Sequence, residues 1–86
     1  MNELHEHRIK RLYMRSIRRG IKEMDIILTR FADARLAALP EDKLELYDAF
    51  LSENDQDLYQ WVSGQMPGPE QYNALIAEIA EYGAFR

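Results

Sequence analysis

Apolar side chains recur every three or four positions along the first part of the chain, which is the period of an amphipathic α-helix. The members of this stripe are Ile9, Leu12, Tyr13, Ile17, Ile21, Met24, Leu28 and Phe31. A single helix over residues 3–38 would extend about 54 Å at a rise of 1.5 Å per residue, and so small a domain could not cover it. Gly20 lies midway, and a glycine in a helix interior costs about 1 kcal/mol. We therefore predict two helices, over residues 3–18 and 21–37, with a break at Gly20.

Proline, asparagine and glycine residues divide the rest of the chain into three shorter helices. Pro40 suits the first position of the third helix, where its missing N–H costs nothing. Asn54 is predicted to cap the fourth helix, which would end at Gly64. Pro69 would open the fifth helix, and Gly83 would stop it. The predicted core side chains of these helices are Leu44, Tyr47, Phe50, Leu51, Leu58, Trp61, Val62, Tyr72, Leu75, Ile76 and Ile79.

No segment shows the sustained period-two alternation of a β-strand. The pattern therefore predicts an all-α fold, a small five-helix bundle, in a single helical domain over residues 1–86. Hydrophobic residues make up 47% of the chain and charged residues 30%, which is the composition of a globular domain rather than of a disordered segment. A chain of 86 residues is one domain in size, and we expect it to be a monomer.

Charge is divided unevenly along the chain. The net charge is −4, yet residues 1–35 carry 9 Lys and Arg against 5 Asp and Glu, whereas residues 36–86 carry 2 against 10. Such a chain suits electrostatic steering of a partner, or docking of its two halves on each other. Solvated helix faces that merely differ in sign explain it equally well. Because the later helices are acidic and the net charge is negative, we expect no nucleic acid partner.

The sequence offers no obvious membrane segment. The longest run of large apolar residues is Ile26–Leu28, against the roughly 20 residues that a membrane-spanning helix needs. The basic N-terminal stretch is not followed by the apolar core of a signal peptide, and Glu3 and Glu6 argue against a transit peptide. Cysteine is absent, which is compatible with a reducing compartment. We therefore expect a cytoplasmic protein without membrane insertion.

The residue types of a catalytic centre are scarce. His5 and His7 are two positions apart, so on a helix they point in different directions and cannot chelate one ion. The serines have no histidine at a plausible spacing. The acidic run 53–57 has the composition of part of a calcium loop but lacks its glycine and its final glutamate. We expect neither an enzyme nor a metal or cofactor site.

A compact charged stretch surrounds the predicted break between the first two helices. Arg19 and Glu23 are four residues apart, the spacing of an intrahelical ion pair, but with Arg on the N-terminal side, which is the weaker orientation. Gly20 has no Cβ, so another backbone could approach it closely. One interpretation is a plain helix–glycine–helix turn. The other is an exposed recognition patch with both signs of charge, and we expect Arg19, Gly20 and Glu23 to be exposed.

This stretch resembles the R-G-x-x-E-x-D motif of the small succinate dehydrogenase assembly factors that assist flavinylation. The motif is present as Arg19-Gly20-Ile21-Lys22-Glu23-Met24-Asp25, after an Arg15-Ser16 pair similar to the family's lead-in. A second similar block consists of residues 46–51 followed by 55–62, with a proline turn and a final helix behind it. The resemblance covers residues 8–82. Among its few departures, Val62 stands where leucine is frequent.

The resemblance implies a five-helix bundle that binds the flavoprotein subunit of succinate dehydrogenase, and in some bacteria that of fumarate reductase. The family promotes covalent attachment of FAD to a histidine of the partner, and the bond-forming chemistry is attributed to the partner. Carried over to this chain, Arg19, Gly20 and Glu23 would contact the flavoprotein near its flavin, with Arg15 and Asp25 flanking. The alternative function is a small helical antitoxin or adaptor that binds a membrane or cytoskeletal partner.

Overall fold

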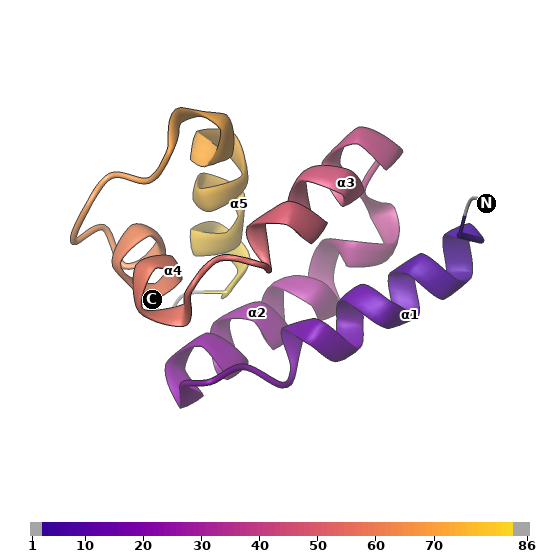
Figure 1. The fold of residues 1–86 in the computed structure, drawn as a ribbon, viewed down its shortest axis with the longest axis horizontal. Coiled ribbons are helices and arrows are strands. Elements are labelled where there is room, and N and C mark those ends of the chain that lie inside the picture. Colours follow the sequence, from indigo (N-terminus) through magenta and orange to yellow (C-terminus); the bar gives the residue numbers. More distant parts are fainter. Residues whose placement is uncertain (1–2, 84–86) are drawn as a thin grey trace.

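The computed structural model describes residues 3–83, and these form five α-helices and two short 3-10 helices with no β-strand among them (Figure 1). The elements in chain order are α1 (His5–Ser16), α2 (Lys22–Arg35), η1 (Leu36–Ala38), α3 (Glu41–Phe50), α4 (Asp55–Val62), η2 (Glu70–Tyr72) and α5 (Asn73–Gly83). The predicted all-α fold is confirmed.

The break between the first two helices falls where glycine predicted it, although it is wider than one residue. Helix α1 ends at Ser16 and α2 begins at Lys22, with an extended backbone at Ile21 (φ −127°, ψ 144°). Between them, the amides of Arg19 and Gly20 donate to carboxylates rather than to helix carbonyls. These side-chain acceptors give the backbone an alternative to the helical ladder, so the helix stops before the glycine.

The cap of α4 follows the sequence closely, whereas the predicted start of the fifth helix is wrong by four residues. The side chain of Asn54 accepts a hydrogen bond from the amide of Gln56 at 2.8 Å, which confirms it as the cap of α4. Gly64 lies just past the end of this helix in the left-handed conformation (φ +85°), which favours glycine. Pro40 precedes the first residue of α3 by one position, and Pro69 opens the 3-10 turn η2 rather than α5.

Helix α2 lies at the centre of the bundle. It packs against α5, α1 and α4, and Figure 1 shows α1 running alongside it in the opposite direction. The largest fully buried apolar side chains are Leu12, Met24, Leu28, Phe31, Leu36, Leu44, Tyr47, Phe50, Leu58, Leu75 and Ile79. Of the core side chains predicted for the last three helices, only Trp61 and Ile76 are no more than partly buried. Trp61 lies at the edge of the aromatic cluster, with ring centroids 6.2 Å from Phe50 and 6.1 Å from Tyr72.

One polar contact is enclosed in this core. The hydroxyl of Ser16 donates to the carbonyl of Leu12 at 2.8 Å and lies 2.6 Å from the phenolic oxygen of Tyr47. Both side chains are fully buried. Burial raises the pKa of Tyr47 to about 12, because the phenolate would be poorly solvated there. The contact fixes the last turn of α1 against α3, and so fixes where the chain leaves α1.

Candidate protein-binding surface

The charged motif lies where α1 turns into α2, and we call residues 17–23 the α1–α2 corner. The corner projects from one end of the helix pair in Figure 1, so its outer side faces solvent. Ser16, just before it, is anchored in the core, and Met24, just after it, is fully buried. A short segment held at both ends by buried side chains presents the groups between them in a defined arrangement.

Arg19 is not exposed, contrary to the expectation from its spacing to Glu23. Only 10% of its side chain is accessible to solvent, and its Nε donates to Oδ1 of Asp55 at 2.7 Å. The remaining guanidinium nitrogens donate to carbonyls at the end of α3 and after it, those of Leu51 at 3.0 Å and Glu53 at 3.4 Å. The guanidinium thus provides donors for backbone carbonyls at the C-cap of α3 and in the connection that follows it. Arg19 ties the corner to the α3–α4 connection.

Gly20 is held by the same carboxylate. Its amide donates to Oδ2 of Asp55 at 2.7 Å. A Cβ added at position 20 would lie 2.7 Å from that oxygen. No left-handed backbone requires glycine here, since the positive φ within residues 3–83 is that of Gly64. Glycine therefore leaves the space that the carboxylate of Asp55 occupies, while its outer side remains exposed.

Asp25, two residues past the corner in α2, also holds the corner backbone. Its carboxylate accepts a hydrogen bond from the backbone amide of Arg19 and is half-buried. By contrast, the side chains of Arg18, Lys22 and Glu23 are exposed and form no hydrogen bond or ion pair within residues 3–83. The side chains that the corner offers to a partner are therefore these three.

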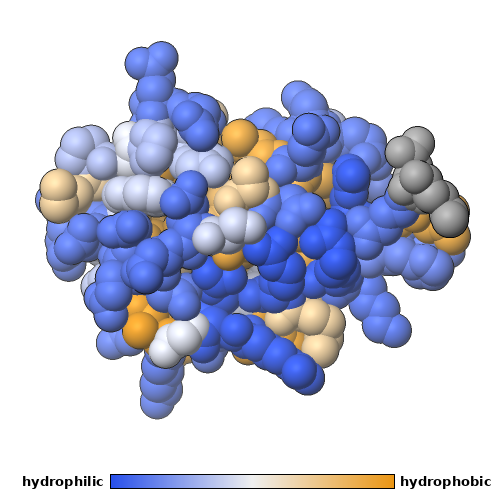
Figure 2. Space-filling view, viewed as in Figure 1, coloured by the Kyte–Doolittle hydropathy of each residue, from blue (hydrophilic) through white to orange (hydrophobic). Residues whose placement is uncertain are grey.

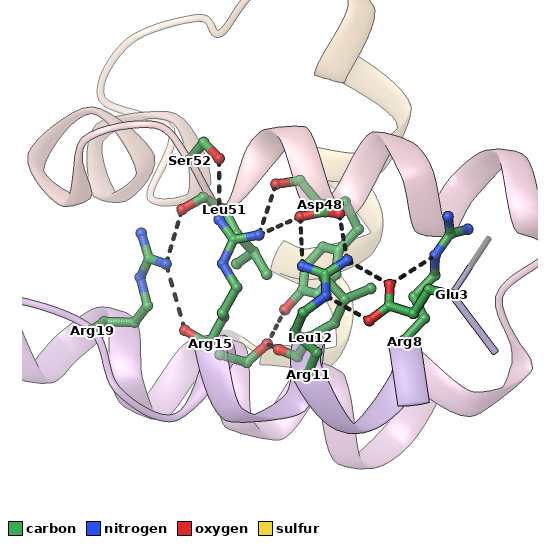
Figure 3. A network of polar contacts seen from close by, with 11 residues as sticks. Glu3, Arg8, Arg11, Leu12, Arg15, Arg19, Asp48, Leu51 and Ser52 are labelled. Atoms are coloured by element: carbon green, nitrogen blue, oxygen red, sulfur yellow. Dashed lines mark hydrogen bonds and ion pairs between the residues drawn. The ribbon is translucent and has the colours of Figure 1, made fainter. Parts of the chain in front are cut away.

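Arg15 belongs to a network that joins α1 to α3 (Figure 3). Its guanidinium donates to the carboxylate of Asp48 and to Oγ of Ser52 at 3.1 Å. Arg11 donates to the other oxygen of Asp48 at 2.8 Å and to Glu3 at 2.8 Å. These contacts, chiefly the hydrogen bond from Arg11, lower the pKa of Asp48. Arg15 therefore links α1 to α3 within the protein, next to the corner.

A shallow hollow of about 550 Å³ opens along α1 next to the corner. It is lined by Arg11, Met14, Arg15, Arg18 and Arg19. Met14 is 36% exposed, and the face drawn in Figure 2 is hydrophilic with small apolar patches. Because Arg18 alone of its four arginines forms no hydrogen bond or ion pair within residues 3–83, it is the cation in the hollow that a partner could engage directly.

The role of Asp55 was not evident from the sequence. Its position in the first turn of α4 suggested only a favourable interaction with the helix dipole. Nothing in the spacing links it to Arg19 or Gly20, which precede it by 36 and 35 residues. The signal that could have drawn attention to it was its place in the second block that resembles the assembly-factor family.

No group of three or more metal-ligating side chains lies close together in the part of the chain that the structure describes. Nor is any helix of that part long and apolar enough to cross a membrane.

Comparisons with known proteins agree with the motif. The family model described as "Flavinator of succinate dehydrogenase" (Sdh5) matches residues 10–83. A protein named succinate dehydrogenase assembly factor 2, mitochondrial, from Aspergillus terreus is 46% identical over 57 residues, which cover 66% of this chain and 19% of the relative. Proteins of the same name from Drosophila grimshawi and Schizosaccharomyces pombe are 38% identical over 74 residues and 33% identical over 82 residues. These matches cover 84% and 93% of this chain, and 50% and 59% of the relatives' own length, so the chain spans only part of each relative.

The expectation of a cytoplasmic location is wrong, since these relatives are named as mitochondrial proteins. The expectation rested on the pattern of the N-terminal residues and on the absence of cysteine. A lack of cysteine fits any reducing compartment and therefore does not identify one.

Proposed function

Since this chain belongs to the family of flavinators of succinate dehydrogenase, we propose that it binds the flavoprotein subunit of that enzyme and promotes covalent attachment of FAD to it. The family match supports a role in succinate dehydrogenase assembly. The observation that carries the proposal of flavoprotein binding is the α1–α2 corner. Its exposed charged side chains extend from a backbone that Asp55 holds through Arg19 and Gly20. In this proposal the chain acts in the mitochondrion, where its relatives are named.

The residues of the R-G-x-x-E-x-D motif divide into two roles in this proposal. Glu23 and the outer side of Gly20 face the flavoprotein, together with the neighbouring cations Arg18 and Lys22. Arg19 supports this surface from inside. Such a surface fits a partner face that carries charges of both signs, since complementary potentials fix the register of an interface and exclude wrong partners.

Two residues border this surface without forming its centre. Arg15 is bound to Asp48, and Asp25 accepts from the corner backbone, so each orders its surroundings. The chain is proposed to act without catalysis. It would bind and order the flavoprotein, and the partner's own groups would form the bond between its histidine and FAD. A chaperone of this kind works by favouring one conformation of its partner, which requires only differential binding.

The experiment that tests the proposal is capture of partners by the tagged chain, followed by in-gel flavin fluorescence of the captured proteins. We expect a flavoprotein of dehydrogenase size in the captured fraction. We also expect its covalent flavin to increase when the chain is supplied with FAD. Capture of a small membrane protein in its place would support the antitoxin or adaptor alternative and would refute the proposal.

A further inference from the structure

A single carboxylate holds both residues of the Arg-Gly pair in this chain. Oδ1 of Asp55 accepts from the side chain of Arg19 at 2.7 Å, and Oδ2 accepts from the backbone amide of Gly20 at 2.7 Å. One contact fixes a side chain and the other fixes the main chain one residue further on. Together they determine both the position and the direction in which the chain crosses from α1 to α2.

The side chain of Asp55 is largely shielded from solvent in its contact with Arg19 and fits the space beside Gly20. The side chain of Asp55 is 20% exposed and that of Arg19 10%, so the ion pair is largely shielded from water. Hydrogen bonds to charged groups are stronger and shorter than neutral ones. Gly20 leaves the space that the carboxylate fills, because a Cβ there would meet Oδ2 at 2.7 Å. The absence of a side chain at Gly20 therefore leaves room for a carboxylate that lies 35 residues further along the sequence.

We propose that Asp55 is a positioning residue for the α1–α2 corner: through Arg19 and the Gly20 amide it holds the exposed edge of the corner in the conformation that binds the flavoprotein. This inference rests on the proposed function. It assigns a supporting role in binding to the first turn of α4, which carries Asp55. Arg19 extends the same hold to the carbonyl of Leu51 at the end of α3.

The expected consequence of losing Asp55 is a weaker complex of a protein that is still folded. A corner that spends about one tenth of its time in the binding conformation binds about ten-fold more weakly. Helix α4 keeps its Asn54 cap, and its buried residues Leu58 and Val62 are untouched by the change. The bundle should therefore survive.

The experiment compares Asp55→Ala with Asp57→Ala. Asp57 lies in the same first turn, is exposed, and forms no hydrogen bond or ion pair within residues 3–83. Both variants remove one negative charge from the N-terminus of α4, so the effect on the helix dipole is matched. Gly20→Ala is a third variant, which keeps the carboxylate but displaces it. Two quantities are measured well below the melting temperature: the affinity for the purified flavoprotein subunit, and the hydrogen-exchange rate of the backbone amide at position 20 in the free protein.

We expect Asp55→Ala and Gly20→Ala to weaken binding by about ten-fold and to accelerate exchange of the amide at position 20, as loss of a positioning contact requires. Asp57→Ala should stay within about two-fold of wild type in affinity, as surface changes usually do. Unchanged affinity of folded Asp55→Ala, beside a wild-type chain that binds, would overturn the inference alone. A wild-type chain that does not bind the flavoprotein would overturn the proposed function first, and the inference with it.

Discussion

Oγ of Ser16 lies 2.6 Å from the phenolic oxygen of Tyr47 and joins the last turn of α1 to α3 inside the apolar core. Ser16 donates its proton to the carbonyl of Leu12, so the tyrosine must be the donor between the two hydroxyls. The point at which the chain leaves α1 is therefore fixed by a polar contact from which water is excluded.

Ser16→Ala should destabilise the protein more than Tyr47→Phe. The alanine variant leaves the buried Tyr47 hydroxyl without a partner, which costs about 1–3 kcal/mol. The phenylalanine variant leaves Ser16 satisfied by Leu12. Urea unfolding of both variants measures the two free energies. Equal losses, or a larger loss for Tyr47→Phe, would show that the hydroxyl of Tyr47 has another acceptor.

Stability should fall at alkaline pH because of Tyr47. Its pKa is about 12 in the folded protein, raised from 10.0 by burial, so folding favours the neutral phenol. The contribution of Tyr47 to the free energy of unfolding is complete below pH 10. It is lost as the pH rises toward 12, by about 3 kcal/mol in all. In Tyr47→Phe this part of the loss should vanish. Urea unfolding of wild type and Tyr47→Phe between pH 9 and about pH 12 measures the free energy of unfolding of each protein. If this free energy fell equally with pH in both, Tyr47 would not be the cause of the alkaline loss.

Arg18 should contribute to partner binding through its charge. Arg18→Glu is expected to weaken the complex with the flavoprotein on the order of ten-fold at low salt, with a smaller effect as salt rises. Lys10→Glu is the matched control, since Lys10 is also exposed on α1 but does not line the hollow beside the corner. Binding titrations at two salt concentrations measure the affinity of each variant for the flavoprotein. Equal effects of the two reversals would mean that only the net charge of the chain matters.

Much of the fold could be predicted from local signals. Gly20 marks the break, Asn54 caps α4, and the helical stripe of apolar residues identifies most of the core. These features depend on neighbours within one or two turns, which a single sequence displays. Trp61 is less buried than expected because it lies at the edge of the aromatic cluster. Residues at the edge and at the centre of a core recur with the same helical period, so the sequence pattern does not distinguish them.

Which residues of the candidate site are exposed, and which partners they bind, could not be predicted from such local signals. The sequence predicted an exposed Arg19 beside Glu23, whereas Arg19 is largely buried and binds Asp55 from the start of α4. That contact depends on how α4 packs beside the corner, and no local pattern encodes it. The division of the motif into exposed and supporting residues therefore required the structure. Binding of the flavoprotein by these residues stays a prediction.

Glu23→Ala tests most directly whether the corner acts on the flavoprotein through its exposed side chains. Glu23 is exposed and forms no hydrogen bond or ion pair within residues 3–83, so its loss should change stability by no more than about 0.5 kcal/mol. Glu45→Ala, which removes another exposed glutamate, on α3, serves as the control.

The decisive measurement is the covalent flavin fluorescence of the flavoprotein subunit after incubation with FAD and each form of the chain, read beside the thermal midpoint of that form. We predict that wild type and Glu45→Ala raise covalent flavin alike, and that Glu23→Ala melts like wild type but fails to raise it. Full flavinylation with folded Glu23→Ala would contradict the claim that this surface of the corner acts on the flavoprotein.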